Sequence, residues 1–230
     1  MGLVPGGNVL LLCRHVGTAV LCKYKLLLMA KITNNDLELV YHLFSQITPV
    51  TQNDIEGVLP FLRKAVYAKN EKILDLGQTE TRLKFVTKGI VHMYTYIDGN
   101  VFTINISLPG MLFNSLDSYL NKKPTNEIQE AVSDVELLFL EKKDAEQLML
   151  NNNTFCYIYA KLFEQVLSVR EQRTLMLQYR DAYKRFEHFF NLSSNAKLYL
   201  QEVPQKLLAR YLGLAPETFC RVKSQYFKDC

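Results

Sequence analysis

A short stretch near the C-terminal end of the chain carries side chains that suit the edges of DNA bases. Glu217, Thr218 and Arg221 stand at the start of an apolar helical pattern and share its outer face. Arginine can donate two hydrogen bonds to guanine, glutamate can accept one from cytosine, and threonine can contact a thymine methyl group or a phosphate. The basic residues of this stretch that suit phosphate oxygens are Lys206, Arg210 and Lys223. Double-stranded DNA is the partner that these residue types indicate.

Two short helices joined by a tight turn would position these residues. Pro204 can open the first helix, because its missing N–H is not needed there, and Gly213 can end it in the left-handed conformation. Pro216 opens the second helix. The apolar residues that repeat at helical spacing are Leu207, Leu208, Tyr211, Leu212, Phe219, Val222 and Tyr226. The pattern predicts a helix-turn-helix, whose second helix enters the major groove; a helical hairpin with a solvated charged face is the alternative.

The segment 205–221 reads Gln-Lys-Leu-Leu-Ala-x-Tyr-Leu-Gly-Leu-x-Pro-Glu-Thr-x-x-Arg and resembles the helix-turn-helix of the Crp/Fnr (catabolite-activator) family. It looks most like the branch found in Bacteroidetes-type bacteria. The resemblance implies a winged reader, base readout by Glu217, Thr218 and Arg221, and RNA polymerase as a partner. One residue departs from the family pattern. Ala215 replaces the usual Ser or Thr that caps the recognition helix, a loss of about 1 kcal/mol.

The composition is that of an ordinary globular protein, with 48% hydrophobic residues and a net charge of +4. Residues 178–230 contain nine Lys or Arg and five Asp or Glu, so this segment carries the whole excess of positive charge. A positively charged C-terminal segment beside an otherwise neutral chain is the charge distribution expected of a protein with a DNA-binding domain.

The five cysteines, Cys13, Cys22, Cys156, Cys220 and Cys230, form no close pair. This odd and scattered set favours reduced thiols and a cytoplasmic location. The iron–sulfur members of the resembling family need an N-terminal cysteine cluster and another cysteine in the barrel. No cysteine lies between Cys22 and Cys156, so we expect no such cluster and no cofactor.

Residues 1–30 fit poorly with the rest of the chain. They are Gly- and Pro-rich at first and then apolar, but charged residues interrupt the apolar run before it reaches the ~20 residues of a membrane helix. A secretory signal would order its charges differently. We interpret the stretch as an upstream extension of a domain that begins near Met29, and an accessory helix or a membrane-surface segment as the alternatives.

The first half of the chain predicts two helices followed by a β-roll. Segments 36–44 and 51–62 are amphipathic, and Thr51 suits the N-cap of the second. Short strands with glycine turns then run from about 72 to 141, and Asp98-Gly99 is a strong type I′ hairpin signal. Antiparallel strands of this kind predict a barrel or jelly roll. The segment resembles the β-roll of cyclic-nucleotide-binding domains.

The residues that would bind a cyclic nucleotide by that resemblance are replaced. Asn114-Ser115 stands about where the family has Gly-Glu, and Thr125-Asn126 stands about where it has Arg-Ser or Arg-Thr. Lys122 or Lys123 could meet an anion only as a point charge. We therefore expect an effector other than cyclic AMP, or a purely structural roll. Because His92 is the single histidine in the strands and no catalytic arrangement is apparent, we expect no metal site and no enzyme.

Residues 153–179 form the longest helical pattern. Its seam, with alternating spacings of three and four, consists of Tyr159, Leu162, Val166, Val169, Arg173 and Met176. This spacing is typical of a coiled coil and predicts a dimerisation helix, in which Arg173 would pair with Glu164 or Glu171 of the partner. A long helix packed on its own roll is the alternative.

These expectations combine into an α+β architecture. It has a β-roll sensor at 31–150, a dimerisation helix at 151–180 and a winged helix-turn-helix at 181–230. The expected function is a homodimeric, sequence-specific transcriptional regulator on a palindromic operator, with half-sites about one helical turn apart. The first alternative is a ligand-binding or scaffold protein with the same roll that does not bind DNA. The second is a cupin-like metalloenzyme.

Overall fold

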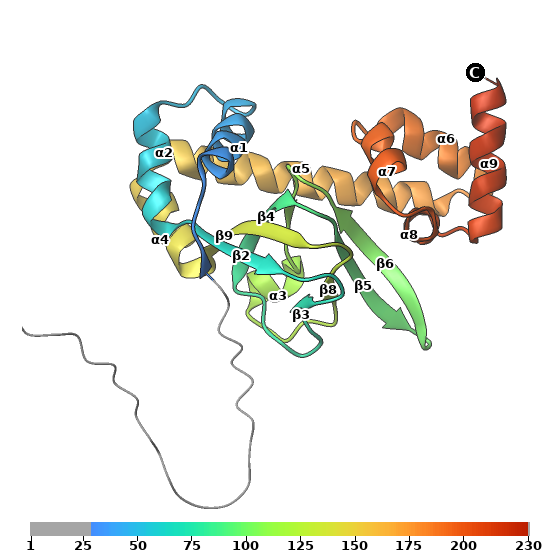
Figure 1. The fold of residues 1–230 in the computed structure, drawn as a ribbon, viewed down its shortest axis with the longest axis horizontal. Coiled ribbons are helices and arrows are strands. Elements are labelled where there is room, and N and C mark those ends of the chain that lie inside the picture. The colour runs from blue at the N-terminus through green and yellow to red at the C-terminus, as the bar shows by residue number, and fades with distance from the viewer. Residues whose placement is uncertain (1–28, 230) are drawn as a thin grey trace, which may run out of the picture.

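The computed structural model describes residues 29–229. Figure 1 shows a β-roll in the middle, a small helical group on one side of it, and a second helical group at the C-terminal end. The helix α5 (Asn153–Gln178) runs along the molecule and joins these parts. The expected extension at 1–30 lies outside the described residues except for Met29 and Ala30, which form the short strand β1.

Two capped helices precede the roll. Helix α1 (Asn34–Ser45) and helix α2 (Gln52–Val58) each begin with a capping box, in which a Thr and an Asp three residues later satisfy each other's backbone N–H. Thr51 is the N-cap of α2, as predicted. The helix ends earlier than the predicted residue 62 and continues as a 3-10 turn (Leu59–Phe61). Pro60 explains this difference, because it has no N–H to donate to the preceding turn.

The roll consists of two antiparallel sheets, so the predicted strand region is confirmed. One sheet has the strand order β1-β2-β9-β4-β7 and the other has the order β3-β8-β5-β6. The strands after β1 are β2 (Arg63–Tyr67), β3 (Lys72–Leu74), β4 (Arg82–Lys88), β5 (Val91–Ile97), β6 (Asn100–Ser107), β7 (Leu112–Phe113), β8 (Ile128–Ala131) and β9 (Val135–Glu141). Asp98 and Gly99 both have positive φ, which is the type I′ turn expected between β5 and β6.

Helices cover the roll and continue from it. The short helix α3 (Leu116–Asn121) lies between β7 and β8, and α4 (Lys142–Asn151) leads into α5. Asn152 caps α5 through a hydrogen bond to the N–H of Phe155. One hydrophobic core holds α1, α2, α4 and the first half of α5 against the outer face of β4 and β9.

The C-terminal group contains α6 (Ala182–Leu192), α7 (Ala196–Glu202), α8 (Gln205–Tyr211) and α9 (Pro216–Asp229). Helices α8 and α9 are the predicted pair, with Pro204 before the first, Gly213 at φ 63° between them and Pro216 at the start of the second. The predicted wing is not confirmed. In the described part of the chain, residues 142–229 form helices and no strand.

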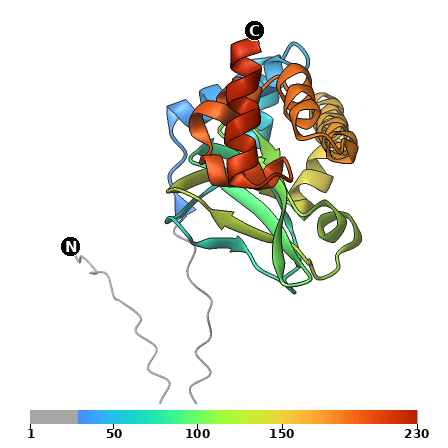
Figure 2. The same ribbon diagram turned by 90° about the vertical axis from the view of Figure 1, so that its right-hand side faces the viewer.

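The C-terminal group packs directly on the roll. Ile106 of β6 and Leu108 after it are fully buried in the same core as Phe186, Tyr199 and Leu208 of the helices. The hydroxyl of Tyr199 donates to the carbonyl oxygen of Ile106 at 2.6 Å. Seen from the C-terminal end, α9 lies at the outer surface of the molecule (Figure 2).

Candidate functional site

The polar residues of the α8–α9 hairpin face solvent, and its apolar residues face inward. Phe219, Val222 and Tyr226 are buried, and so are the four apolar residues predicted for α8. Of the predicted base-reading residues, Glu217 and Arg221 are exposed and Thr218 is half-buried. They come together on one exposed face at the start of α9.

The predicted phosphate contacts surround this face. Lys206 and Arg210 are exposed on α8, and Lys223 is half-buried on α9. The charge of Arg210 helps to lower the pKa of His92 on β5, which places Arg210 at the junction between the reader and the roll.

The turn between α8 and α9 is held by an arginine that sequence reasoning missed. Arg185 of α6 donates through Nη1 to the carbonyl oxygens of Leu212 and Gly213, at 3.1 and 2.8 Å. Carbonyl groups at a helix end have no partner within the helix, so this contact stabilises the turn. Because Arg185 is far from the turn in sequence, no local pattern reveals its role.

Ala215 occupies the N-cap of α9. Its carbonyl oxygen accepts the first helical hydrogen bond, from the N–H of Phe219 at 2.9 Å. Its exposed methyl group cannot accept from the free N–H groups of the first turn. Helix α9 therefore begins where the sequence predicted, with Ala215 at the position that the family pattern fills with Ser or Thr.

The predicted seam of α5 lies mainly on the face that the chain itself covers. Leu162 and Met176 are only 6% and 3% exposed, because they belong to the cores around the roll and the reader. Tyr159 and Val166 are half-buried, and Val169 is exposed. Leu162 and Met176 are not available to a partner, so the seam as predicted requires correction.

Arg173 is also held within its own chain; its predicted ion pair with Glu164 or Glu171 of a partner stays a prediction. Its Nη2 donates to the carbonyl oxygens of Thr103 on β6 and Tyr211 at the end of α8. Its guanidinium lies 4.6 Å from the centre of the Tyr211 ring. One side chain of α5 therefore contacts both the roll and α8.

The opposite face of α5 carries exposed apolar residues. Tyr157, Leu167 and Leu175 are 49%, 53% and 55% exposed, and Ala160 lies between the first two. Their spacing places them on one side of the helix, away from the roll. This face is the part of α5 that a second copy of the chain could cover.

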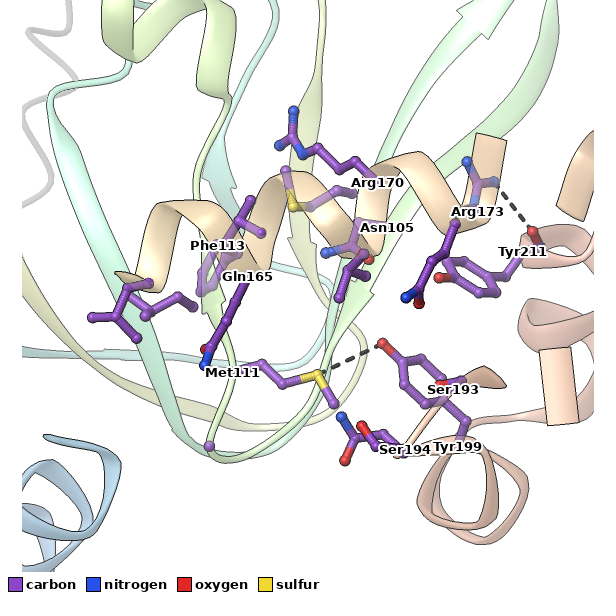
Figure 3. A pocket seen from close by; sticks show the side chains of 18 of the residues that line it. Asn105, Met111, Phe113, Gln165, Arg170, Arg173, Ser193, Ser194, Tyr199 and Tyr211 are labelled. Atoms are coloured by element: carbon purple, nitrogen blue, oxygen red, sulfur yellow. Dashed lines mark hydrogen bonds between the residues drawn. The ribbon is translucent and has the colours of Figure 1, made fainter. Parts of the chain in front are cut away.

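A cleft of about 610 Å³ lies between the roll, α5 and the C-terminal helices. Figure 3 shows Gln165 and Arg173 of α5, Met111 of the roll and Tyr199 of α7 around it. Five of the six predicted seam residues line it, all except Tyr159. The seam pattern thus identifies the wall of a cleft within one chain.

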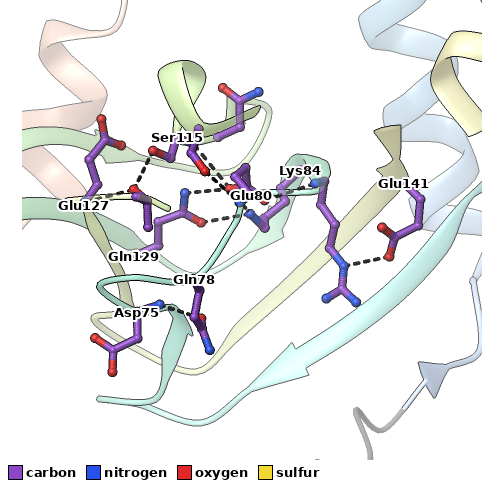
Figure 4. Close-up of polar contacts among 12 residues, drawn as sticks. Asp75, Gln78, Glu80, Lys84, Ser115, Glu127, Gln129 and Glu141 are labelled. Atoms are coloured by element: carbon purple, nitrogen blue, oxygen red, sulfur yellow. Dashed lines mark hydrogen bonds and ion pairs between the residues drawn. The ribbon is translucent and has the colours of Figure 1, made fainter. Parts of the chain in front are cut away.

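The interior of the roll contains a buried ion pair where the resembling family holds its ligand. Figure 4 shows Lys84 and Glu80 in contact, with Gln129 bonded to both. The carboxylate of Glu80 also accepts from the N–H of Ser115. Burial lowers the pKa of Lys84, and the charge of Glu80 opposes this change. Lys84, Glu80 and Gln129 therefore satisfy one another, whereas Asn114 Nδ2 and Glu127 Oε2 are buried without a hydrogen-bond partner in the described structure.

The replaced phosphate-site residues join this network. The hydroxyl groups of Ser115 and Thr125 are hydrogen-bonded to each other at 2.8 Å, and Thr125 Oγ1 also accepts from the N–H of Glu127 at 2.9 Å. Lys123 is exposed and pairs with Asp117, and Lys122 is exposed at the end of α3. Neither lysine points to a buried anion site.

His92 is a packed residue of the sheet. Its Nε2 lies 3.0 Å from the hydroxyl of Thr103, and its ring stacks on Tyr94. Burial lowers its pKa from 6.5 to about 4, with a contribution from the charge of Arg210. Within residues 29–229, no group of three or more His, Cys, Asp and Glu side chains could hold a metal ion.

Comparison with known proteins supports the fold. Residues 64–152 match the family model for the cyclic nucleotide-binding domain. FixK2 from Bradyrhizobium japonicum is similar over 73% of this chain and 85% of its own, with 20% identity and a TM-score of 0.60. The catabolite activator protein of Thermus thermophilus is 23% identical over 81% of this chain and 87% of its own, with a TM-score of 0.50.

A third structure, a transcriptional regulator of the CRP/FNR family from Thermus thermophilus, is 20% identical. It covers 72% of this chain and 86% of its own, with a TM-score of 0.52. No curated protein matches the sequence. The chain therefore has a cyclic nucleotide-binding type of roll followed by helices, arranged as in these regulators. None of its described helices is long and apolar enough to cross a membrane.

Proposed function

We propose that this protein is a homodimeric transcriptional regulator of the Crp/Fnr type that binds DNA through α8 and α9. The observation that carries the proposal is the exposed face at the start of α9. It presents Glu217, Thr218 and Arg221 outward while Phe219 and Val222 anchor the helix in the core. In a helix-turn-helix, these N-terminal residues of the second helix meet the base edges.

Each side chain has a separate part in recognition. Arg221 donates two hydrogen bonds to a guanine, and Glu217 accepts one from a cytosine. Thr218 contacts a thymine methyl group or a phosphate. Lys206 and Lys223 bind phosphates and fix the register of α9 in the groove, with Arg210 as a third cation beside the roll.

The dimer contact in this proposal is the exposed face of α5 centred on Leu167. It replaces the seam predicted from Tyr159, Leu162, Val166, Val169, Arg173 and Met176, because part of that seam is buried within the chain. A two-fold dimer presents two copies of α9 and therefore reads a palindrome. Contact with RNA polymerase is a further part of the proposal and rests on the family resemblance alone.

The effector in this proposal is not cyclic AMP. The family resemblance would require an arginine for the phosphate, and the interior of the roll has the Glu80–Lys84 pair instead. A buried carboxylate at this place repels an anion and already accepts the N–H of Ser115. An effector of different chemistry must bind elsewhere or be absent.

The alternative is a scaffold protein that has this fold but does not bind DNA. Binding to random-sequence duplex DNA at several salt concentrations separates the two functions. The proposal predicts an affinity that falls steeply with salt. Lys223→Ala should make this slope shallower by about two, one for each subunit of the dimer. Lys88→Ala is the matched control, since Lys88 is 68% exposed on the roll. No binding at low salt would favour the scaffold.

A further inference from the structure

The cleft between the roll and the reader has an apolar floor and a polar rim. The floor includes Phe85, Met93 and Val166, and the rim includes Asn105, Gln165 and Ser193. Its volume of about 610 Å³ lies within the usual range of small-molecule sites. Figure 3 shows that the rim residues come from β6, α5 and the α6–α7 connection. A ligand here would touch all three parts of the molecule.

The charged side chains that line the cleft are all positive. Among its described lining residues are Arg170 and Arg173, and none is Asp or Glu. An apolar cleft lined by cations and amides attracts an anion, and its low-dielectric walls strengthen this attraction.

Two nitrogen atoms in the wall lack a hydrogen-bond partner in the described structure. They are the buried Nε of Arg173 and Nε2 of His188. Buried polar atoms are normally satisfied, so such atoms need an explanation. Arg173 lies in the second half of α5 and His188 on α6, and both side chains line the cleft.

Arg170 differs from Arg173 in having a buried acid nearby. Glu127 raises the pKa of Arg170 in opposition to burial, and Arg170 donates to the carbonyl oxygen of Asn114. Arg173 forms no ion pair with any described residue, and its guanidinium donates to backbone carbonyl oxygens. Arg173 is therefore the cation whose charge is left for a ligand.

We infer that this cleft binds an organic anion with an apolar body, whose carboxylate, phosphate or sulfonate group contacts Arg173 and His188. The apolar body lies on the floor formed by Phe85, Met93 and Val166. This site is separate from the interior of the roll, where the Glu80–Lys84 pair lies. A neutral molecule with the same apolar body would bind less tightly, because only an anion supplies a strong hydrogen-bond partner for the two buried nitrogen atoms.

The same site would regulate the reader. Arg173 contacts the carbonyl oxygen that ends α8, so an anion on its guanidinium changes how the reader is held against α5. By linkage, a ligand that prefers one reader position changes the affinity for DNA by the same factor as DNA changes the affinity for the ligand. This second step rests on the proposed function, whereas the binding itself does not.

Two fluorescent probes test the binding in the full-length protein without DNA. Anilinonaphthalene sulfonate has an apolar body and an anionic group, and N-phenylnaphthylamine is nearly the same body without the charge. We expect saturable binding of one sulfonate per chain. Arg173→Gln and His188→Gln should each weaken the sulfonate at least about tenfold and change the neutral probe by less than about twofold.

Two further variants control for folding. Gln165→Glu adds a carboxylate to the exposed rim with almost no change in shape, and it should weaken only the sulfonate. Arg180→Gln removes an exposed arginine outside the cleft and should change neither probe. The inference is overturned if Arg173→Gln and Gln165→Glu leave sulfonate binding unchanged, or if they weaken both probes equally.

A DNA measurement keeps this inference apart from the proposed function. Sulfonate binding that depends on Arg173, in a protein that never binds DNA, would support the cleft site and refute the regulator. A second outcome is a protein that binds the sulfonate through Arg173 and also binds DNA. If saturating sulfonate then leaves the affinity for DNA unchanged, the coupling between the two sites is overturned.

Discussion

The guanidinium of Arg173 donates to the carbonyl oxygen of Tyr211 at 3.1 Å. Arg173 lies in the second half of α5, and Tyr211 is the last residue of α8. Arg173 also contacts the carbonyl oxygen of Thr103 in the roll. A single side chain of α5 therefore contacts both the roll and the end of α8.

The N-cap of α9 offers a stabilising substitution. Ala215→Thr should raise the free energy of unfolding of the C-terminal helices by about 1 kcal/mol, because the new hydroxyl accepts from an N–H of the first turn. Thermal denaturation measures the change. Ala215→Val has the same branched shape without the hydroxyl and should give no gain. Equal behaviour of the two variants would contradict the proposed N-cap.

The two faces of α5 predict different effects on assembly. Leu167 and Val169 are almost equally exposed, at 53% and 50%, but Val169 lines the cleft and Leu167 lies on the free face. Leu167→Glu should convert the dimer to a monomer, because a charge in an apolar contact is costly. Val169→Glu should remain dimeric. Light scattering measures the oligomeric state of both variants. A dimeric Leu167→Glu with a monomeric Val169→Glu would favour the seam predicted from the sequence.

The ion pair inside the roll predicts a large loss when one partner is changed. Glu80→Gln leaves the ammonium group of Lys84 buried beside Gln129 without a counter-charge. Removing one partner of a buried pair costs about 3–5 kcal/mol. Adding Lys84→Met to Glu80→Gln should recover most of this loss in urea denaturation. A double variant no more stable than Glu80→Gln would show that the ammonium is not the source of the cost.

His92 predicts a loss of stability in acid. Its folded pKa of about 4 lies below the ordinary value of 6.5, so the unfolded chain binds the proton more tightly. The contribution is present above about pH 6.5 and is lost as the pH falls toward 4. Linkage gives about 2 kcal/mol between about pH 7 and 5. His92→Gln should remove this part of the pH dependence; an unchanged pH profile would refute the assignment.

The reader could be predicted from the sequence because its signals are local. Pro204, Gly213 and Pro216 set the helix ends, and the inward residues repeat at helical spacing, so the hairpin is correct almost to the residue. The roll could be predicted in the same way from Asp98-Gly99 and the other turns. Strands β2 and β8 were not predicted, because no comparable turn signal marks their ends.

The contacts between distant segments could not be predicted. The 3–4 spacing in α5 shows that Leu162 and Met176 share a face, but it does not say whether their own chain or a partner covers that face. Lys84 and Glu80 look like ordinary surface charges until the fold buries them. Arg173 is the clearest case, since its acceptors on Thr103 and Tyr211 are far away in sequence.

Selection from a random pool of duplex DNA tests the central claim most directly. The full-length protein and its Arg221→Ala variant would be compared, after circular dichroism shows that the variant is folded. We predict that the protein enriches a palindrome with half-sites about one helical turn apart, and that the variant loses the preference at one position of each half-site. If the protein enriches no sequence, with or without the cleft probe, or if the variant enriches the same palindrome equally well, then α9 does not read DNA as proposed.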